Sequence, residues 1–211
     1  MTKRTPVPKR LGRPPDVNSA ETRSRLLVEA RTSFAKNGFD ATTNKDLAAA
    51  AGITTGAIYH YFGSKAEMYL AVYAEVQTLV YAAFEAAIAD HVTLLGQFSA
   101  VLDAAVELNR QDSSLAGFVV GVAGETQRHP EIADPLLTLA GRGTVFLHSM
   151  VQASLDRGEL AVDIDPQAVE DLMNSVLSGL ARFSTQIGDS RRQAAAVDAL
   201  KRFVGGSLVA R

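Results

Sequence analysis

The chain has 211 residues, 21 Lys+Arg and 23 Asp+Glu, a formal net charge of −2 and a hydrophobic content of 47%. This size and composition can bury one sizeable core, or the cores of one small and one medium domain. The absence of cysteine excludes disulfides, thiolate metal sites and cysteine nucleophiles, and fits a reducing compartment. Without a signal peptide or an apolar run long enough to span a bilayer, we predict a cytoplasmic protein with no membrane partner.

Charge is distributed unevenly along the chain. Residues 1–65 hold 11 Lys+Arg and 5 Asp+Glu, whereas residues 66–211 hold 10 and 18. A basic region can neutralise DNA phosphates and release counterions, and an acidic remainder limits nonspecific binding to nucleic acid. Charged blocks are often plain solvated surface, so this asymmetry only supports a nucleic-acid partner.

Residues 1–17 form a basic arm, which we predict to be disordered because it combines five cations with four prolines. Its Leu11-Gly12-Arg13-Pro14-Pro15 stretch is similar to the Gly-Arg-Pro centre of an AT-hook, whose arginine enters the narrow minor groove of A·T-rich DNA. Either the arm binds in this way through Arg10 and Arg13, or it is only a basic, solubilising tail.

The pattern of residues 18–63 predicts three helices. The first covers about residues 18–36, with apolar residues at three- and four-residue spacing. The second ends at Gly52, because glycine adopts a left-handed turn at little cost. The third follows threonine caps, and Ile58 and Phe62 anchor its inner face. Its outer face is polar and aromatic, with Thr55, Gly56, Tyr59 and His60.

The full string from Thr42 to Lys65, TTNKDLAAAAGITTGAIYHYFGSK, is more specific than two helices separated by a glycine. Two small helices could form an ordinary corner, with Tyr59 and Tyr61 filling the core beneath it. However, the segment Ala-Gly-Ile-Thr-Thr-Gly-Ala-Ile-Tyr-His-Tyr-Phe, followed by Ser-Lys-Ala-Glu, closely resembles the DNA-binding domain of the TetR family of bacterial transcriptional regulators. The resemblance covers roughly residues 19–70, and beyond them only the helical layout is similar.

The resemblance implies a helix-turn-helix whose recognition helix enters the major groove of double-stranded DNA. Gly56 and Ala57 have no hydrogen-bonding side chains, so base recognition would depend on Lys45, Thr55 and His60. His60 could instead contact phosphate or have no role. The positions that match backbone contacts are Thr43, Tyr59, Tyr61 and Lys65, those at or near base edges are Lys45, Thr55, Gly56, Ala57 and His60, and Thr54 is a flanking hydroxyl.

Residues 64–211 are predicted to form a helical ligand-binding and dimerisation domain. Ser64 caps a long helix that continues to about Asp90, and Lys65 lies in its first turn. A phosphate contact by Lys65 would therefore couple movement of this helix to DNA reading. Since no alternating strand or fixed repeat period is present, the fold class is all-α. Further helices are expected at 94–111, 114–128, 135–157, 166–187 and 191–209.

The last two predicted helices carry apolar stripes, which we expect to form the interface of a homodimer. In TetR-like proteins the final two helices of each subunit pair into a four-helix bundle, and a twofold protein matches a palindromic operator. Alternatively, the stripes only close the core of the monomer. The expected interface residues are Leu172, Val176, Gly179, Leu180, Phe183, Leu200, Phe203 and Val204.

The middle helices offer a candidate cavity for a small apolar ligand. Gly117, Gly121 and Gly124 lie about one turn apart, so they either open space for a ligand or permit close helix packing. Carboxylates on these helices favour a neutral or cationic ligand. The expected apolar lining is Phe84, Phe98, Leu102, Phe118, Val122, Phe146 and Met150, with Asp103 and Glu125 as polar anchors.

Enzyme motifs are absent: there is no HExxH, P-loop or GxSxG pattern, and the four histidines form no close metal-ligand pair. We therefore expect no catalytic residue, no metal and no cofactor. The sequence predicts a DNA-binding regulator, most often a repressor, in which a ligand shifts the population away from the operator-binding state. Two alternatives are a ligand-independent regulator acting through a protein partner and a sequence-tolerant architectural DNA-binding protein.

Overall fold

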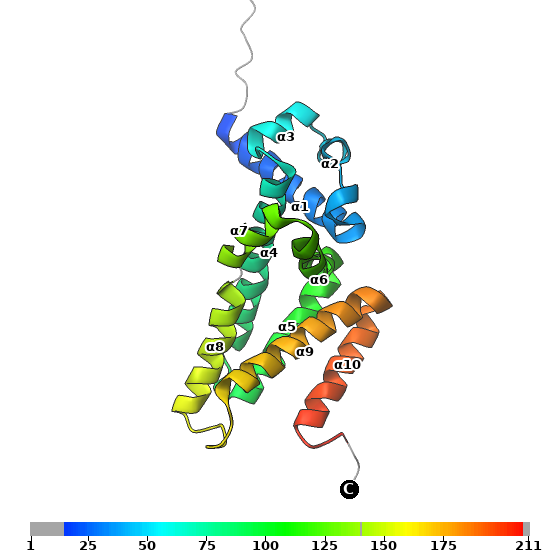
Figure 1. The fold of residues 1–211 in the computed structure, drawn as a ribbon. Coiled ribbons are helices and arrows are strands. Elements are labelled where there is room, and N and C mark those ends of the chain that lie inside the picture. The colour runs from blue at the N-terminus through cyan, green and yellow to red at the C-terminus, as the bar shows by residue number, and fades with distance from the viewer. Residues whose placement is uncertain (1–14, 140, 209–211) are drawn as a thin grey trace, which may run out of the picture.

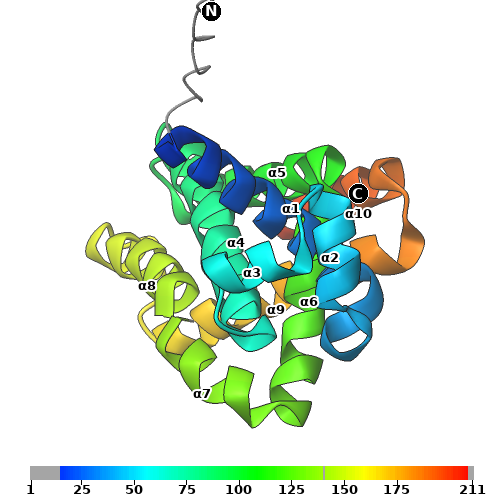
Figure 2. The same ribbon diagram turned by 90° about the horizontal axis from the view of Figure 1, so that it is seen from above.

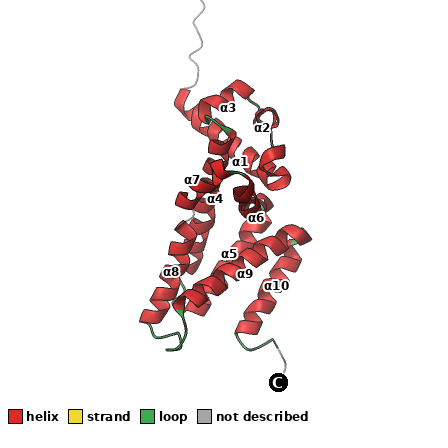
Figure 3. Cartoon of the chain, viewed as in Figure 1, coloured by secondary structure: helices red, strands yellow, loops and turns green. Residues whose placement is uncertain are grey.

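The structure is a computed structural model in which residues 15–139 and 141–208 are described, with side chains from residue 19 onward. Within these residues the chain is helical and contains no strand, so the predicted all-α fold is confirmed (Figure 3). The described helices are α1 (Pro15–Ala41), α2 (Asn44–Ala51), α3 (Thr55–Tyr61), α4 (Lys65–Ile88), α5 (Leu94–Gln111), α6 (Ser113–Arg128), α7 (Pro130–Leu139), α8 (Gly141–Asp156), α9 (Pro166–Ile187) and α10 (Ser190–Val204).

The three N-terminal helices gather at one end of the molecule, and α4 leads away from them (Figure 1). Helices α5, α8, α9 and α10 occupy the opposite end, whereas α6 and α7 lie between the two groups. Seen from above, α2 and α3 lie over α4 and α6 (Figure 2). Of the three N-terminal helices, α1 is the one that packs extensively against both α4 and α6.

Helix ends follow local sequence signals. Thr93 caps α5 and Asp165 precedes the Pro166 that begins α9, an arrangement in which proline lacks only a hydrogen bond that the first turn does not need. The helix predicted at 135–157 is instead divided into α7, which begins at Pro130, and α8. The last helix ends at Val204, before the expected residue 209, because Gly206 at φ 69° turns the chain.

Two apolar cores hold the helices together. The first joins α1–α4 to α6 and α7, and its centre is aromatic: the ring centroid of Tyr69 lies 5.0 Å from that of Phe34 and 4.8 Å from that of Phe118. The second core lies between α4, α5, α8 and α9. Helix α6 therefore contributes to the same core as the N-terminal helices. In the described part of the chain, none of the helices is both long and apolar enough to cross a membrane.

Candidate nucleic-acid interface and ligand cavity

Two hydroxyl caps and one glycine set the geometry of α2 and α3. The Oγ1 of Thr43 accepts a hydrogen bond from the backbone N–H of Asp46 (3.2 Å), and the Oγ1 of Thr54 accepts one from Ala57 (3.2 Å). Gly52, at φ 66°, ends α2 in the left-handed conformation. All of these contacts span a few residues, so the turn between the two helices is encoded locally.

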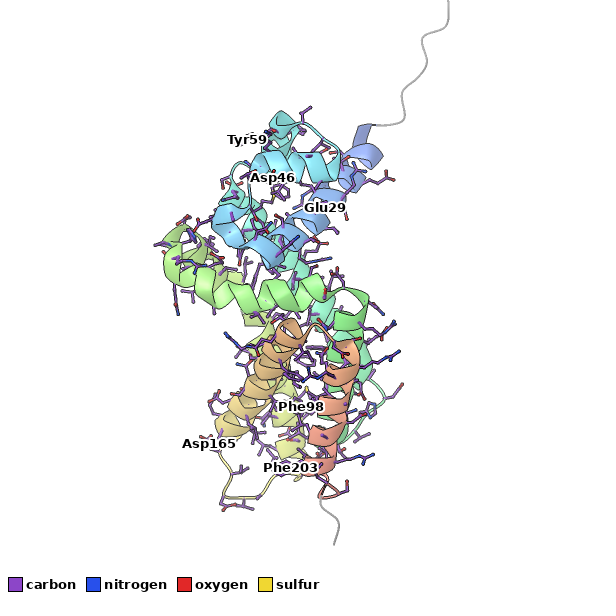
Figure 4. The ribbon with its side chains drawn as sticks, turned by 90° about the vertical axis from the view of Figure 1, so that its right-hand side faces the viewer. Glu29, Asp46, Tyr59, Phe98, Asp165 and Phe203 are labelled. Atoms are coloured by element: carbon purple, nitrogen blue, oxygen red, sulfur yellow. The ribbon has the colours of Figure 1, made fainter. Side chains whose placement is uncertain are left out.

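Helix α3 presents a polar and aromatic surface. Ile58 is buried beneath it, whereas 58% of Tyr59 is exposed. Asn44 Nδ2 donates a hydrogen bond to the Tyr59 hydroxyl (3.2 Å) and so joins α2 to α3. Sequence reasoning missed Asn44 because its partner lies one helix further on. Tyr59 lies at the end of the molecule remote from Phe203 (Figure 4).

The predicted DNA-binding residues differ in exposure. Ala57 and Tyr61 are half-buried, and Tyr61 packs against the first core. Arg10 and Arg13 lie outside the described residues. The exposed members of the set are Thr43, Lys45, Thr54, Thr55, Gly56, Tyr59 and His60.

The side chain of Lys65 turns inward, which differs from the outward position that the sequence analysis predicted. Its Nζ donates to the backbone carbonyls of Phe39 (2.7 Å), Thr42 (3.1 Å) and Asp40 (3.4 Å), and lies 4.3 Å from the centre of the Phe39 ring. An ammonium group has three N–H donors, and these carbonyls occupy them. Lys65 therefore closes the kinked end of α1 with the ammonium that was predicted to contact phosphate.

Three more cations of the N-terminal helices have intramolecular partners. Arg31 pairs with Asp112, Arg25 Nε donates to a carbonyl at the end of α2 (3.0 Å), and the Arg23 guanidinium lies 5.1 Å from the centre of an aromatic ring. Lys45 is exposed, and no described acidic side chain forms an ion pair with it. Lys45 is therefore better placed than Lys65 to contact phosphate.

Helices α1 and α6 share a polar link near the start of α6. Arg31 is only 5% exposed; its Nε donates to Ser114 Oγ (2.9 Å), and its guanidinium forms an ion pair with Asp112. Partial burial acts to raise the pKa of Asp112, but hydrogen bonds from Ser114 and the charge of Arg31 prevail and hold that pKa below its usual value. This pair fixes α1 against α6.

A second link joins the end of α6 to the kink of α1. The buried Glu125 carboxylate accepts a hydrogen bond from the Phe39 N–H (3.1 Å) and lies 3.0 Å from the Arg128 guanidinium. Gly38 makes this approach possible, because it adopts φ 78° and a Cβ there would lie 2.9 Å from Glu125 Oε1. His129 Nε2 lies 3.6 Å from the same carboxylate. Glu125, predicted as a ligand anchor, therefore connects α6 to α1.

A cavity lies between α4, α5, α6, α9 and α10. Its free volume is about 160 Å³, within about 850 Å³ of space that includes the open mouth. Gln77, Asn109, Asn174 and Gln193 contribute carboxamides, and Asn109 Nδ2 donates to Gln193 Oε1 (2.8 Å). The apolar lining includes Val76, Val80, Phe84, Leu108, Leu115 and Val119.

Among the predicted ligand-binding residues, Phe84 lines this cavity and the others lie elsewhere. Phe118 belongs to the first core, and Phe146 and Met150 to the second. Asp103 forms a surface ion pair with Lys201 on α10. Leu102 is buried away from the cavity, Val122 packs on the first core, and Phe98 on the second.

The glycines of α6 favour close packing at one position. A Cβ at Gly117 would lie 3.2 Å from the Ala35 Cβ of α1, so this glycine lets the two helices approach. Gly121 has nothing within 4 Å of such a Cβ, and Gly124 meets only Arg128 at 4.0 Å. The cavity is instead lined from α6 by residues on a neighbouring face, including Ala116.

Four of the eight predicted dimer residues are exposed on α9 and α10, and three of these four are large and apolar. Exposure is 63% for Leu172, 67% for Phe203 and 53% for Val204. Gly179 is exposed, whereas Val176, Phe183 and Leu200 are half-buried, and Leu180 lines the cavity. An apolar surface of this kind on a single chain is typical of an interaction site.

The α2–turn–α3 unit, with an outward polar helix resting on a helical bundle, defines a helix-turn-helix DNA-binding protein. Residues 26–72 match the family described as "Bacterial regulatory proteins, tetR family". Residues 26–72 of the chain therefore carry the DNA-binding domain of the TetR family of transcriptional regulators.

Known proteins are similar to it over different lengths. The HTH-type transcriptional regulator UidR of Escherichia coli (strain K12) is 25% identical over 189 residues, which cover 90% of this chain and 94% of UidR. The HTH-type transcriptional repressor KstR2 of Rhodococcus jostii (strain RHA1) is 52% identical over 46 residues, 22% of each chain. The structure of Salmonella enterica GusR is 25% identical, with a TM-score of 0.69 over 89% of this chain and 95% of GusR.

Proposed function

We propose that this regulator is a homodimeric repressor without catalytic activity, which leaves a palindromic operator when a small, mainly apolar ligand occupies the cavity. The observation that carries this proposal is the exposed surface of α3, where Thr55, Tyr59 and His60 lie over the buried anchor Ile58. A helix presented in this way can place its first turn against base edges while neighbouring groups contact phosphates.

The exposed apolar surface of α9 and α10 supports the dimer. Leu172, Val176, Gly179 and Phe183 recur at three- and four-residue spacing, so they share one face of α9. A twofold pairing through this face would place one recognition helix on each side of the axis. On B-DNA the two helices must lie about 34–36 Å apart, or a multiple of that distance, to reach successive major grooves.

Ligand release is supported by two shared helices. Both α4 and α6 line the cavity, and both pack against the N-terminal helices. The Arg31–Asp112 pair and the Glu125–Phe39 hydrogen bond join α6 to α1, so a ligand that displaces α6 would also move α1. The ligand must bind the released state more tightly, since equal affinity for both states would shift nothing.

In functional terms, we divide the chain into a basic arm (1–17), a DNA-reading part (18–63) and a part for ligand and partner (64–211). The arm would supply further phosphate contacts, because it carries five cations.

The first experiment is to select bound sequences from a random DNA pool at physiological salt. We expect a palindrome with half-sites about one helical turn apart. On that operator, His60→Ala should weaken binding about tenfold or more, because the change occurs in both half-sites. His91→Ala is the matched control, since His91 is exposed but remote from α3. A pool without enrichment would favour an architectural DNA-binding protein.

The dimer is tested separately by sedimentation equilibrium. We expect Phe203→Asp to convert the dimer into monomers, because it places a charge in an apolar interface. Leu137→Asp on α7 is the control, since Leu137 is 78% exposed and lies outside the proposed interface. Dimers that persist in Phe203→Asp would place the interface on another surface.

A further inference from the structure

The cavity differs from the rest of the molecule in its charge. Every side chain that lines it is uncharged, although α4, α5, α6, α9 and α10 all carry charged residues on other faces. Its one tyrosine, Tyr81, is neutral near neutral pH like any tyrosine, and burial raises the pKa of its hydroxyl further. An ionic ligand would lose its hydration here and find no counter-ion, which is costly.

The polar side chains that line the cavity are four carboxamides, Tyr81 and Ser178, and one carboxamide oxygen lacks a hydrogen-bond donor. Asn109 and Gln193 satisfy each other in part through the 2.8 Å hydrogen bond between α5 and α10. Gln77 Oε1 on α4 is buried, and no described group donates a hydrogen bond to it. Buried acceptors in folded proteins are nearly always paired. A hydroxyl or N–H donor on a bound molecule would complete this pairing.

The volume of the cavity limits the size of the ligand. The free volume of about 160 Å³ is close to the volume of about 150 Å³ at which an apolar cavity in another protein binds benzene. The open mouth extends the space beyond this, so a frame of one or two fused rings fits better than a long chain.

On these grounds we infer that the cavity selects an uncharged, compact, mainly apolar molecule with one hydrogen-bond donor for Gln77 Oε1. This inference rests on the proposed function of the cavity as the ligand site, and it adds the chemical class of the ligand. Anionic effectors, including carboxylates and phosphate esters, are excluded from this class.

A matched series of probes tests the inference on the full-length protein without DNA. The probes are 2-naphthalenemethanol, naphthalene, 2-naphthoate and 2-naphthylmethylammonium, which share one frame and differ in charge and donor. By calorimetry, we expect the alcohol to bind at least about tenfold more tightly than either ion. Tighter binding of the carboxylate or the ammonium would overturn the inference, as would no binding of the alcohol.

Two glutamine variants then test the donor contact. Gln77→Leu should weaken binding of the alcohol about tenfold and leave naphthalene binding unchanged, so naphthalene also reports that the cavity has folded. Gln97→Leu is the matched control, because Gln97 Oε1 is likewise buried without a described donor but does not line the cavity. Equal weakening in the two variants would remove Gln77 from the site.

The test of the ligand class can fail independently of the proposed function. Specific operator binding that survives while every neutral probe fails to bind would reject the ligand class and leave the DNA-binding regulator intact. Neutral probes that bind without changing operator affinity would keep the ligand class and reject release by ligand.

Discussion

The exposed surface of α3 and the cavity between α4 and α6 place their polar groups in opposite ways. On α3, Thr55, Tyr59 and His60 point to solvent above an apolar anchor, whereas Gln77 and Gln193 in the cavity are enclosed by apolar walls. The exposed arrangement suits binding of a large, hydrated polyanion such as DNA. The enclosed arrangement suits binding of a small molecule that loses its hydration. The two regions are physically connected, because α6 lines the cavity and is joined by partly buried polar contacts to α1, which packs against α2 and through it reaches α3.

The largest expected effect is a break in this connection at Gly38. Its backbone, at φ 78° and ψ 177°, is in a region that is essentially restricted to glycine, and a Cβ would lie 2.9 Å from Glu125 Oε1. We expect Gly38→Ala to lower the free energy of unfolding by about 3 kcal/mol, measured by urea denaturation. Gly52→Ala is the matched control, since Gly52 has φ 66° but nothing within 4 Å, and should cost only about 1 kcal/mol. Equal losses would show that the approach of Glu125 to Gly38 has no energetic weight.

A smaller effect is expected at the other polar link. Arg31→Met keeps most of the side-chain length but leaves Asp112 without an ion-pair partner, although its hydrogen bonds from Ser114 remain. Because Asp112 is also partly exposed, we expect a loss of about 2 kcal/mol in the free energy of unfolding. The ability of 2-naphthalenemethanol to weaken operator binding should also decrease. Arg142→Met, which breaks the more exposed Arg142–Glu85 pair (3.2 Å), should cost less than about 1 kcal/mol and leave release intact. Full release by Arg31→Met would exclude this link from the coupling between the two regions.

The two regions also differ in how far the sequence predicted them. The cap at Thr54 and the turn at Gly52 act over three or four residues, so a linear pattern was enough to predict them. The cavity combines residues from Val76 to Gln193 on five helices, and no local spacing encodes that packing. The intramolecular contacts of Lys65 and Glu125 were not predicted for the same reason.

The sequence separations of these contacts explain why they could not be predicted. Lys65 contacts the carbonyl of Phe39, 26 residues away, and Glu125 accepts from the N–H of Phe39, 86 residues away. The local sequence does not identify a partner for the polar group of either side chain, because that partner is brought close only by the tertiary structure. The resemblance located the DNA-binding domain correctly, but a residue-by-residue transfer of contacts also required the rotamer of each side chain.

A smaller effect on stability is expected from a substitution of Lys65. Lys65→Met removes the ammonium that holds the carbonyls of Phe39 and Thr42, and we expect a stability loss of about 1 kcal/mol. Operator affinity should change less than about threefold, because this ammonium points inward. Lys45→Met is the paired variant, since Lys45 is exposed. In this variant the slope of log operator affinity against log salt concentration should become shallower, by the equivalent of about one phosphate contact per subunit. A large affinity loss in Lys65→Met with unchanged stability would restore Lys65 to the DNA backbone.

The smallest effect concerns pH and the Arg31–Asp112 link. The pKa of folded Asp112 is held below the ordinary value of 3.8. For a depressed pKa, the stabilisation is present above the unfolded-state value and is lost as the pH falls through the folded-state value. The difference in unfolding free energy between wild type and Asp112→Asn should therefore be constant from about pH 7 to pH 5 and decrease below about pH 4. A difference that is already shrinking between about pH 7 and pH 5 would mean that another group, with a higher pKa, controls the contact between α1 and α6.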